Sequence, residues 1–359
     1  MKKIRIIVID DSAFSRRSIT RMLEGLDSVE VVGYAIDGED GVQKVIALKP
    51  DLVTLDLEMP KMDGFTLLRI LTTRFSLPVI VISALSGADK VFKALELGAL
   101  DFVAKPSGGA SFDLLSIKED LQNKVLQVLA LKPAAHGCIS TGGVASHQEK
   151  CDATLPVPAE TKVVGERGSI DLVAIGSSTG GPPALQKIFS AFQQKYPFAV
   201  VVSQHMPPGF TKAFAERLNR FSLFDVKEAE DGDPVLPGRI LIAPGGSNMI
   251  FEACGGQVTV RIVPPLESDR YVPSIDAMLH SCAGIYRNRL LALILTGMGN
   301  DGSDGIRSVK EHGGCVIAES EETAIVYGMP QKAVATGAVG RCVPLDRIAA
   351  EIIYQGGFS

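Results

Sequence analysis

Short apolar runs alternate with amphipathic stretches along most of the chain, and this alternation constrains the fold more than any other feature. Residues 4–131 contain the strand-like runs IRIIVI, VEVVGYA, DLVTL, PVIVIS and DFVA. A second series begins at Ile170 with DLVAI and continues through FAVVVS, RILIAP, VTVRIV, LLALILT and CVIAES. Strands that alternate with helices build parallel sheets that are covered on both faces. We therefore expect an α/β fold with two doubly wound parallel sheets, and a hairpin around CGGQ at 254–257 in the second half.

The segment between the two series has a different composition. Residues 133–169 contain no aromatic side chains and few large aliphatic ones. Such a segment cannot bury enough apolar area to offset the entropy that is lost on ordering. We therefore predict a first domain at 1–131, a flexible linker at 132–168 and a second domain at 169–359.

Charge and cysteine usage argue against several classes of function. A formal net charge of −5 does not suit a nucleic-acid-binding surface, which needs a basic patch, so we expect no nucleic-acid partner. No apolar tract approaches the roughly 18 residues of a membrane span, and the start, MKKIRIIVIDD, is typical of a first strand rather than a targeting segment. The six cysteines have no CxxC spacing, which is typical of unpaired thiols in a reducing compartment. We expect a cytoplasmic protein with no direct membrane insertion.

Polar side chains follow the strands of the first half, where the carboxyl ends of parallel strands meet. Asp10 and Asp11 end the first strand, and Asp56 ends the third. Three converging carboxylates repel one another unless a cation or protons relieve the repulsion, and oxygen ligands of this kind suit Mg²⁺. Ser83 ends the fourth strand and Lys105 follows the fifth, a hydroxyl and an ammonium that suit an incoming phosphoryl group.

This pattern closely resembles the response-regulator receiver domain of two-component signalling, whose fold is flavodoxin-like. The resemblance covers about residues 3–125 and rests on VIDDS, LDLEMPKMDG, ISA and AKP in that order. It implies that Asp56 accepts a phosphoryl group from a histidine kinase, and that Lys105 and Ser83 stabilise the phosphorylated state. It further implies a switch residue at Phe102 and a Mg²⁺ site formed by Asp10, Asp11, Asp56 and the backbone carbonyl of Glu58.

The stretch IGSSTGG at 175–181 follows the first apolar run of the second half. It lacks the lysine of a GxxxxGK[ST] phosphate loop, and its glycines do not match GxGxxG, although a turn of small residues can still bind an anion. Residues 176–180 do match GxSxG, a sharp turn that exposes a central serine, here Ser178. A short match of this kind also occurs in a tight turn without chemistry. Ser177 is a second hydroxyl beside it, so the identity of the nucleophile depends on the register of the turn.

A serine nucleophile needs a base and an orienting acid. Of the five histidines, His136 and His147 lie in the predicted linker, His312 suits a helix end and His280 a helix face, which leaves His205 after AVVVSQ. LLALILT runs into GMGNDGSDG, where Asp301 is the first acid beyond the strand and Asp304 is its competitor inside the next helix. We favour His205 as the base and Asp301 as the acid. The order Ser, His, Asp differs from that of α/β-hydrolases.

The second half is similar to the chemotaxis protein-glutamate methylesterase family. The motifs IGSSTGG, SQHMPPGFT, AERLN, EAEDGD, IAPGG, PSIDAMLHS and LTGMGNDG carry the resemblance over about residues 170–350. It implies a Rossmann-like α/β esterase domain with the triad Ser178, His205 and Asp301, and backbone oxyanion donors near Thr179 and Met298. The family usually has alanine where Ser177 stands.

The resemblance also implies a function and its control. The reaction would be hydrolysis of glutamate γ-methyl esters on methyl-accepting chemotaxis receptors with release of methanol, together with deamidation of receptor glutamines, and without a cofactor in the esterase. The unphosphorylated receiver would block the catalytic cleft, and phosphorylation by the histidine kinase of the chemotaxis system would relieve the block. A phosphorylation-dependent binding protein without catalysis is the alternative, and a DNA-binding output is poorly supported because no basic recognition helix is evident.

Overall fold

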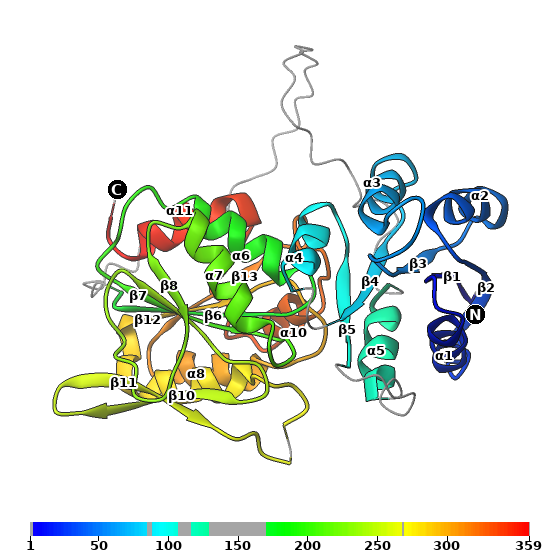
Figure 1. Cartoon of the computed structure of the whole chain (residues 1–359). Helices are drawn as coiled ribbons and strands as arrows, with labels where there is room; N and C mark the ends of the chain where they lie inside the picture. Colours follow the sequence, from blue (N-terminus) through cyan, green and yellow to red (C-terminus); the bar gives the residue numbers. More distant parts are fainter. Residues whose placement is uncertain (1–2, 85–87, 107–115, 129–169, 268, 359) are drawn as a thin grey trace, which may run out of the picture.

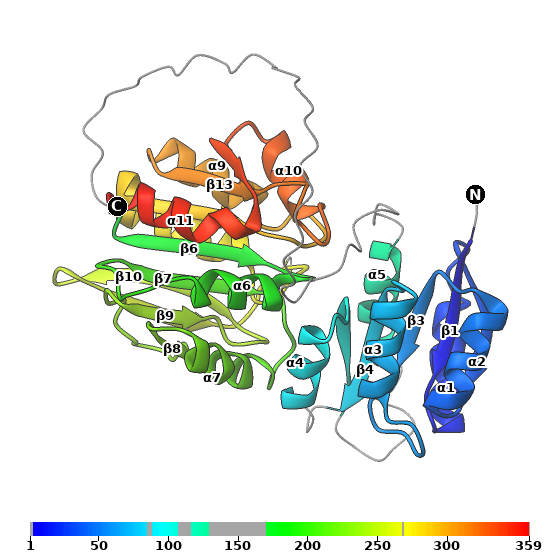
Figure 2. The same cartoon turned by 90° about the horizontal axis from the view of Figure 1, so that it is seen from above.

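The structure is a computed structural model that describes residues 3–84, 88–106, 116–128, 170–267 and 269–358. Two parallel sheets, each with helices on both faces, lie side by side, and an antiparallel hairpin extends from the second (Figures 1 and 2). The α/β prediction with two doubly wound sheets is confirmed. The predicted linker at 132–168, with its two histidines and two cysteines, lies outside the described residues.

The first sheet has the strand order β2-β1-β3-β4-β5, and all its neighbouring strands are parallel. Its strands are β1 (Ile4–Ile9), β2 (Val29–Ala35), β3 (Leu52–Leu55), β4 (Val79–Ala84) and β5 (Asp101–Lys105). One face packs against α1 (Ala13–Leu23) and α5 (Lys118–Val128). The other face packs against α2 (Gly38–Leu48), α3 (Gly64–Arg74) and α4 (Ala88–Glu96). Because the order reverses between β1 and β3, the carboxyl ends of these strands form the expected ligand site.

Polar residues at the strand ends begin several of these helices. Ser12, Asp37 and Asp63 are the N-caps of α1, α2 and α3, and each side chain accepts a backbone N–H three residues later. A cap of this kind satisfies an N–H that has no partner within the helix. The caps therefore fix where each helix starts, and with it the loops that carry the acidic residues.

The second sheet has the order β14-β13-β12-β6-β7-β9-β8, again with parallel neighbours throughout. Its strands are β6 (Leu172–Ser177), β7 (Ala199–Gln204), β8 (Asp225–Glu228), β9 (Arg239–Ile242), β12 (Leu290–Ile294), β13 (Cys315–Glu319) and β14 (Arg341–Val343). The sequence analysis missed β8 and β14. Both are short edge strands with polar residues and little burial, so they lack an apolar pattern.

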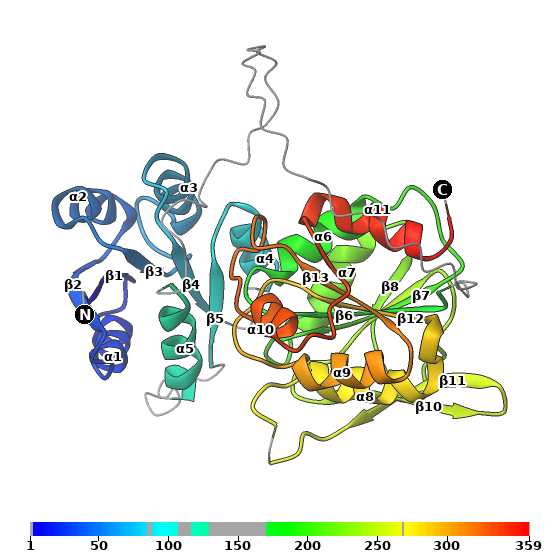
Figure 3. The same cartoon turned by 180° about the vertical axis from the view of Figure 1, so that it is seen from behind.

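Helices cover this sheet from both sides (Figures 1 and 3). The helices α6 (Gly181–Ser190), α7 (Thr211–Phe221) and α11 (Leu345–Gln355) pack on one face. The helices α8 (Ile275–Tyr286), α9 (Ser303–Glu311) and α10 (Met329–Ala335) pack on the other. The predicted hairpin is formed by β10 (Asn248–Cys254) and β11 (Gln257–Val263), with Cys254 paired to Gln257.

The central strand of the second sheet is β6, the first in its sequence, and this topology positions the site. The chain continues from β6 to β7 on one side and later returns to β12 on the other side. The carboxyl ends of β12, β6 and β7 therefore meet at the point where the order reverses, the usual place for a ligand site in a doubly wound sheet.

The two halves share one apolar core across their interface. Helix α4 packs against α6 and α7, and the rings of Phe92 and Phe214 stack with centroids 5.4 Å apart. The rings of Phe102 and Phe210 lie 4.8 Å apart. All four side chains are at most 3% exposed, so this contact excludes water as a domain core does.

Within the described residues, no helix combines the length and the apolar character that a bilayer crossing requires.

Candidate active site

The turn after β6 separates the two candidate serines. Ser177 is fully buried, and its hydroxyl donates to Oε1 of Gln204 at 2.7 Å. Ser178 is only partly buried. Its N–H donates to the carbonyl of Thr296 at 3.0 Å, and its own carbonyl accepts the N–H of Gly181 at 2.8 Å. The turn therefore leaves Ser178 partly exposed and keeps the hydroxyl of Ser177 buried.

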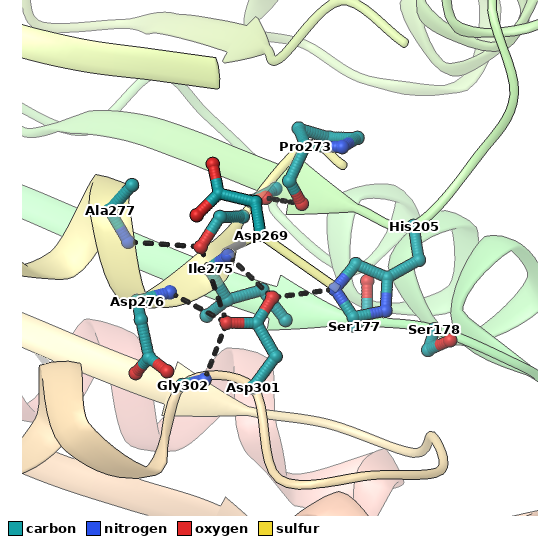
Figure 4. Close-up of polar contacts among 12 residues, drawn as sticks. Ser177, Ser178, His205, Asp269, Pro273, Ile275, Asp276, Ala277, Asp301 and Gly302 are labelled. Carbon is teal, nitrogen blue, oxygen red and sulfur yellow. Dashed lines mark hydrogen bonds and ion pairs between the residues drawn. The ribbon is translucent and has the colours of Figure 1, made fainter. Parts of the chain in front are cut away.

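His205 follows β7 and lies beside this turn. Its backbone N–H donates to the carbonyl of Ser177 at 3.0 Å, and its ring Nε2 lies 2.8 Å from Oδ2 of Asp301. The ring Nδ1 is buried and has no hydrogen-bond partner among the described residues. In Figure 4, Ser178 lies toward the Nδ1 side of the ring. Since a carboxylate only accepts, Nε2 carries a proton and Nδ1 offers a lone pair.

A tyrosine covers the imidazole. The ring of Tyr271 stacks on that of His205 with the centroids 4.7 Å apart and the planes at 3°. The His205 side chain is 10% exposed. Tyr271 therefore restricts the rotation of the imidazole and shields it from water.

Asp301 lies at the N-terminus of α8, where backbone N–H groups lack partners within the helix. Its carboxylate accepts the N–H groups of Ile275 at 2.8 Å, Asp276 at 3.0 Å and Gly302 at 3.0 Å (Figure 4). Burial alone would raise the pKa of Asp301, but the bond to His205 and these backbone donors outweigh it and lower the pKa. The carboxylate is therefore ionised and gives His205 an anionic hydrogen-bond partner.

A second carboxylate lies next to Asp301. Asp276, in the first turn of α8, accepts the N–H of Gly305 in α9 at 2.6 Å. Burial, together with the negative charge of Asp301, raises the pKa of Asp276 to about 6. The two neighbouring acids thus have their pKa values moved in opposite directions.

The backbone around Thr179 and Met298 borders the same turn. A Cβ at Gly297 would lie 2.7 Å from Cβ of Ser178, so the chain before Met298 passes close to the turn after β6. The backbone N–H groups of Thr179 and Met298 have no acceptor among the described residues. A backbone N–H without an acceptor at such a turn is a candidate donor to a bound oxygen.

The competing residues lie elsewhere. Asp304 is exposed and pairs with Arg307. His280 is exposed on α8, and His312 ends α9 with its Nδ1 2.8 Å from the carbonyl of Ser308. The structure thus brings Ser178, His205 and Asp301 to three adjacent strand ends and leaves the alternatives outside.

Sequence reasoning missed several residues of this site. Gln204, Tyr271 and Asp276 all contact the candidate triad, and each lies inside or beside a motif that the sequence analysis quoted. Gln204 directly precedes His205, so its position in the sequence could have indicated that it lies at the site. Tyr271 and Asp276 gave none, because their contacts depend on where the hairpin and α8 pack.

The first sheet brings its own predicted residues together. Asp10, Asp11 and Asp56 each offer a carboxylate oxygen, and these oxygens lie within 4.8 Å of one another. Lys105 bonds Oδ2 of Asp10 at 2.9 Å and also contacts Oδ2 of Asp56. Ser83 is 4% exposed at the end of β4. Three oxygen donors at this spacing fit a hard cation such as Mg²⁺.

The charges at this edge alter one another. Burial raises the pKa of Asp10 even though Lys105 opposes the shift. Burial alone would lower the pKa of Lys105, but Asp10 and Asp56 outweigh it, so the pKa is raised and the ammonium stays charged. The side chain of Glu58 pairs with Lys90 on α4.

Phe102 and Thr179 connect the two sites. Phe102, on β5, is buried against Phe210 of the second half. The adjacent Asp101 accepts a hydrogen bond from the hydroxyl of Thr179, the residue after Ser178. The first domain therefore contacts the turn that carries Ser178.

Comparisons with known proteins agree with this geometry. The chain matches the family model described as CheB methylesterase over residues 173–352 and the model described as response regulator receiver domain over residues 6–113. The chain belongs to the CheB methylesterase family. A protein-glutamate methylesterase/protein-glutamine glutaminase of Geobacter sulfurreducens is 55% identical, with 99% of this chain and 98% of the relative covered.

Two further relatives support the assignment. A CheB relative of Myxococcus xanthus, also called a protein-glutamate methylesterase/protein-glutamine glutaminase, is 44% identical over 96% of this chain and 95% of its own. The crystal structure of the Thermotoga maritima CheB methylesterase catalytic domain superposes with a TM-score of 0.51 at 42% identity, covering 52% of this chain and 99% of that one.

The raised pKa of Asp276 makes a prediction about stability. The folded state holds the Asp276 proton up to a pH of about 6, whereas the unfolded chain releases it near the ordinary value of 3.8. The native state therefore loses stability as the pH rises between these values. Asp276→Asn keeps an acceptor for the N–H of Gly305 and removes the titrating group. The urea midpoint of the variant should therefore rise relative to that of the wild type between pH 4 and 6. Above pH 7 the difference between the two midpoints should stay constant. A constant offset across the whole range contradicts the assignment.

Proposed function

We propose that this CheB-family protein hydrolyses glutamate γ-methyl esters on methyl-accepting chemotaxis receptors, releasing methanol, and that phosphorylation of its first domain activates it. The observation that carries the proposal is the position of Ser178, a partly buried residue directly after β6, on the Nδ1 side of the His205 ring that Asp301 holds (Figure 4). The names of the Geobacter and Myxococcus relatives support the same substrate class and add glutamine deamidation.

The geometry suits serine catalysis with the imidazole in a defined tautomer. Nδ1 of His205 takes the proton of Ser178 as Oγ attacks the ester carbonyl. Nε2–H stays bonded to Asp301, whose negative charge stabilises the imidazolium. The tetrahedral oxyanion accepts hydrogen bonds from the N–H groups of Thr179 and Met298.

The remaining steps return the enzyme to its starting state. The imidazolium gives its proton to the methoxy oxygen, methanol leaves, and the glutamyl group stays on Oγ of Ser178. Water then gives a proton to Nδ1 of His205 as it attacks the acyl carbon, and the Ser178 hydroxyl re-forms as the glutamate departs. A glutamine substrate follows the same path with ammonia as the leaving group.

The first domain supplies the phosphorylation site. Asp56 accepts the phosphoryl group from the histidine kinase of the chemotaxis system. Asp10, Asp11 and Asp56 would hold Mg²⁺ together with the carbonyl of Glu58. Bound there, Mg²⁺ would supply positive charge that offsets the negative charge of the incoming phosphoryl oxygens. Lys105 and Ser83 contact those oxygens afterwards and stabilise the phosphorylated form.

Control acts through the domain contact. In this conformation the receiver covers the nucleophile turn through Asp101 and packs Phe102 against Phe210. Phosphorylation favours a receiver conformation that docks less well, because Lys105 and Ser83 move toward the phosphoryl group and Phe102 follows. A methylated glutamate of the receptor then reaches Ser178.

Replacement of the nucleophile tests the esterase. Ser178→Ala should lower methanol release from methylated receptor membranes by about 10⁴–10⁶-fold, since it removes the attacking atom. Ser177→Ala is the comparison variant and should lose less than about 100-fold, because its hydroxyl is buried and donates to Gln204. The reverse pattern would assign the nucleophile to Ser177, and no release by the wild type would favour a binding protein.

The phosphorylation site has its own test. Incubation with Mg²⁺ and radiolabelled acetyl phosphate should label the wild type and the exposed control variant Asp27→Asn, but not Asp56→Asn, and EDTA should abolish the labelling. Equal labelling of Asp56→Asn would show that the acceptor lies elsewhere.

The domain contact predicts a variant with raised basal activity. Glu96 on α4 pairs with Arg217 on α7 and accepts a hydrogen bond from Gln186 on α6 at 3.1 Å. Glu96→Arg sets two cations against each other, so methanol release without a phosphoryl donor should rise several-fold and the further stimulation by acetyl phosphate should shrink. Glu30→Lys, on the remote edge strand β2, should behave as the wild type. An unchanged basal rate in Glu96→Arg contradicts inhibition through this contact.

A further inference from the structure

Gln204 is a buried amide whose contacts the triad chemistry does not use. It is the last residue of β7 and is 1% exposed. Its Nε2 donates to the carbonyl of Ser178 at 2.9 Å and to the carbonyl of His205 at 3.1 Å. Its Oε1 accepts the hydroxyl of Ser177 at 2.7 Å. One planar group therefore touches the backbone of both the nucleophile and the base.

The chemistry of the partners fixes the orientation of this amide. Backbone carbonyls only accept hydrogen bonds, so the NH₂ group must face Ser178 and His205. The carbonyl oxygen of the amide must then face Ser177, whose hydroxyl has to donate. Each partner thus has a defined role, and a hydroxyl at 177 holds the amide against rotation.

Gly181 leaves the space that the amide occupies. A Cβ at this position would lie 2.0 Å from Oε1 of Gln204 and 2.9 Å from Oγ of Ser177. No side chain fits there without displacing the amide. The small residue at the start of α6 is therefore part of the same arrangement.

These bonds act where the sheet ladder ends. Within the ladder, Ser177 pairs with Gln204, but Ser178 and His205 lie beyond the last paired residues of β6 and β7. The side chain of Gln204 spans the two strand ends at the point where regular pairing stops. A displacement of about 1 Å between reacting groups can cost a hundredfold in rate.

We propose that Gln204 is a positioning residue, which clamps Ser178 and His205 in register, and that Ser177 acts through it by fixing the amide orientation. This inference rests on the proposed function in that Ser178 is the nucleophile. It does not depend on which ester or amide the enzyme hydrolyses.

The test measures the reactivity of Ser178 directly as well as turnover. Full-length wild type, Ser177→Ala, Gln204→Met, the double variant and the control Ser281→Ala are reacted with a sulfonyl fluoride, and Ser178 labelling is followed by peptide mass spectrometry. The control loses a hydroxyl that bonds Met278 within α8, away from the turn. Methanol release from methylated receptors gives kcat and KM for the same set, with acetyl phosphate present.

Gln204→Met should lower both the labelling rate and kcat by about 10–100-fold, with KM within about twofold of the wild type. Ser177→Ala should lower both by a smaller factor, because the bonds from Nε2 remain. The double variant should be no slower than Gln204→Met, since Ser177 acts only through the amide. Ser281→Ala should match the wild type.

Several results would overturn the clamp. The clamp is refuted if Gln204→Met has the same labelling rate and kcat as the wild type. It is also refuted if the losses of the two single variants add in the double variant. If Gln204→Met does not fold, Ser177→Ala still decides the test. An unchanged labelling rate in Ser177→Ala would show that the Ser177 hydroxyl does not hold the amide in place. Wild type that is labelled at Ser178 but releases no methanol refutes the proposed substrate while the labelling rates still judge the clamp. Absence of Ser178 labelling in the wild type refutes both.

Discussion

Asp301 accepts N–H groups from the first turn of α8 on one side and contacts Nε2 of His205 on the other. A helix N-terminus stabilises a negative charge, so the carboxylate is held ionised although it is buried. The bond to His205 then fixes both the orientation of the ring and the nitrogen that carries the proton. Nδ1 is left to face the turn of Ser178, and every step of the proposed reaction uses that nitrogen. Without the anion at this helix end, the ring would have neither its tautomer nor a counter-ion for its cationic form.

The sheet topology explains why one receiver can control this site. The nucleophile turn follows the central strand β6, and helix α6 starts directly after it, so α6 and the neighbouring α7 frame one side of the turn. The receiver packs α4 on these helices and extends Asp101 to Thr179. In the proposed control, a small change at the receiver's own strand ends would reach the turn of Ser178 through this apolar contact. The hydrogen bond from Thr179 to Asp101 is the contact that the proposed activation would have to break.

Much of this arrangement could be predicted from the sequence because it depends on local patterns. Alternating apolar runs identified both sheets, and strand-end polar residues identified Asp56, Ser178, His205 and Asp301 as candidates. The GxSxG pattern favoured Ser178 over Ser177, but the role of Ser177 stayed open, since it depends on which hydroxyl meets Gln204 from the neighbouring strand. Tyr271 and Asp276 were missed for a similar reason: each reaches the site from an element whose packing, not its pattern, brings it there. The edge strands β8 and β14 were missed because edges carry little apolar signal.

The tautomer of His205 is the most direct measure of this account. With only five histidines in the chain, a nitrogen-15 NMR spectrum of histidine-labelled protein near pH 8 can be assigned by the signal lost in His205→Gln. The ring of His205 should carry its proton on Nε2, and Asp301→Asn should weaken this preference. A ring protonated on Nδ1 in the wild type, with Nε2 bare toward Asp301, would contradict this prediction.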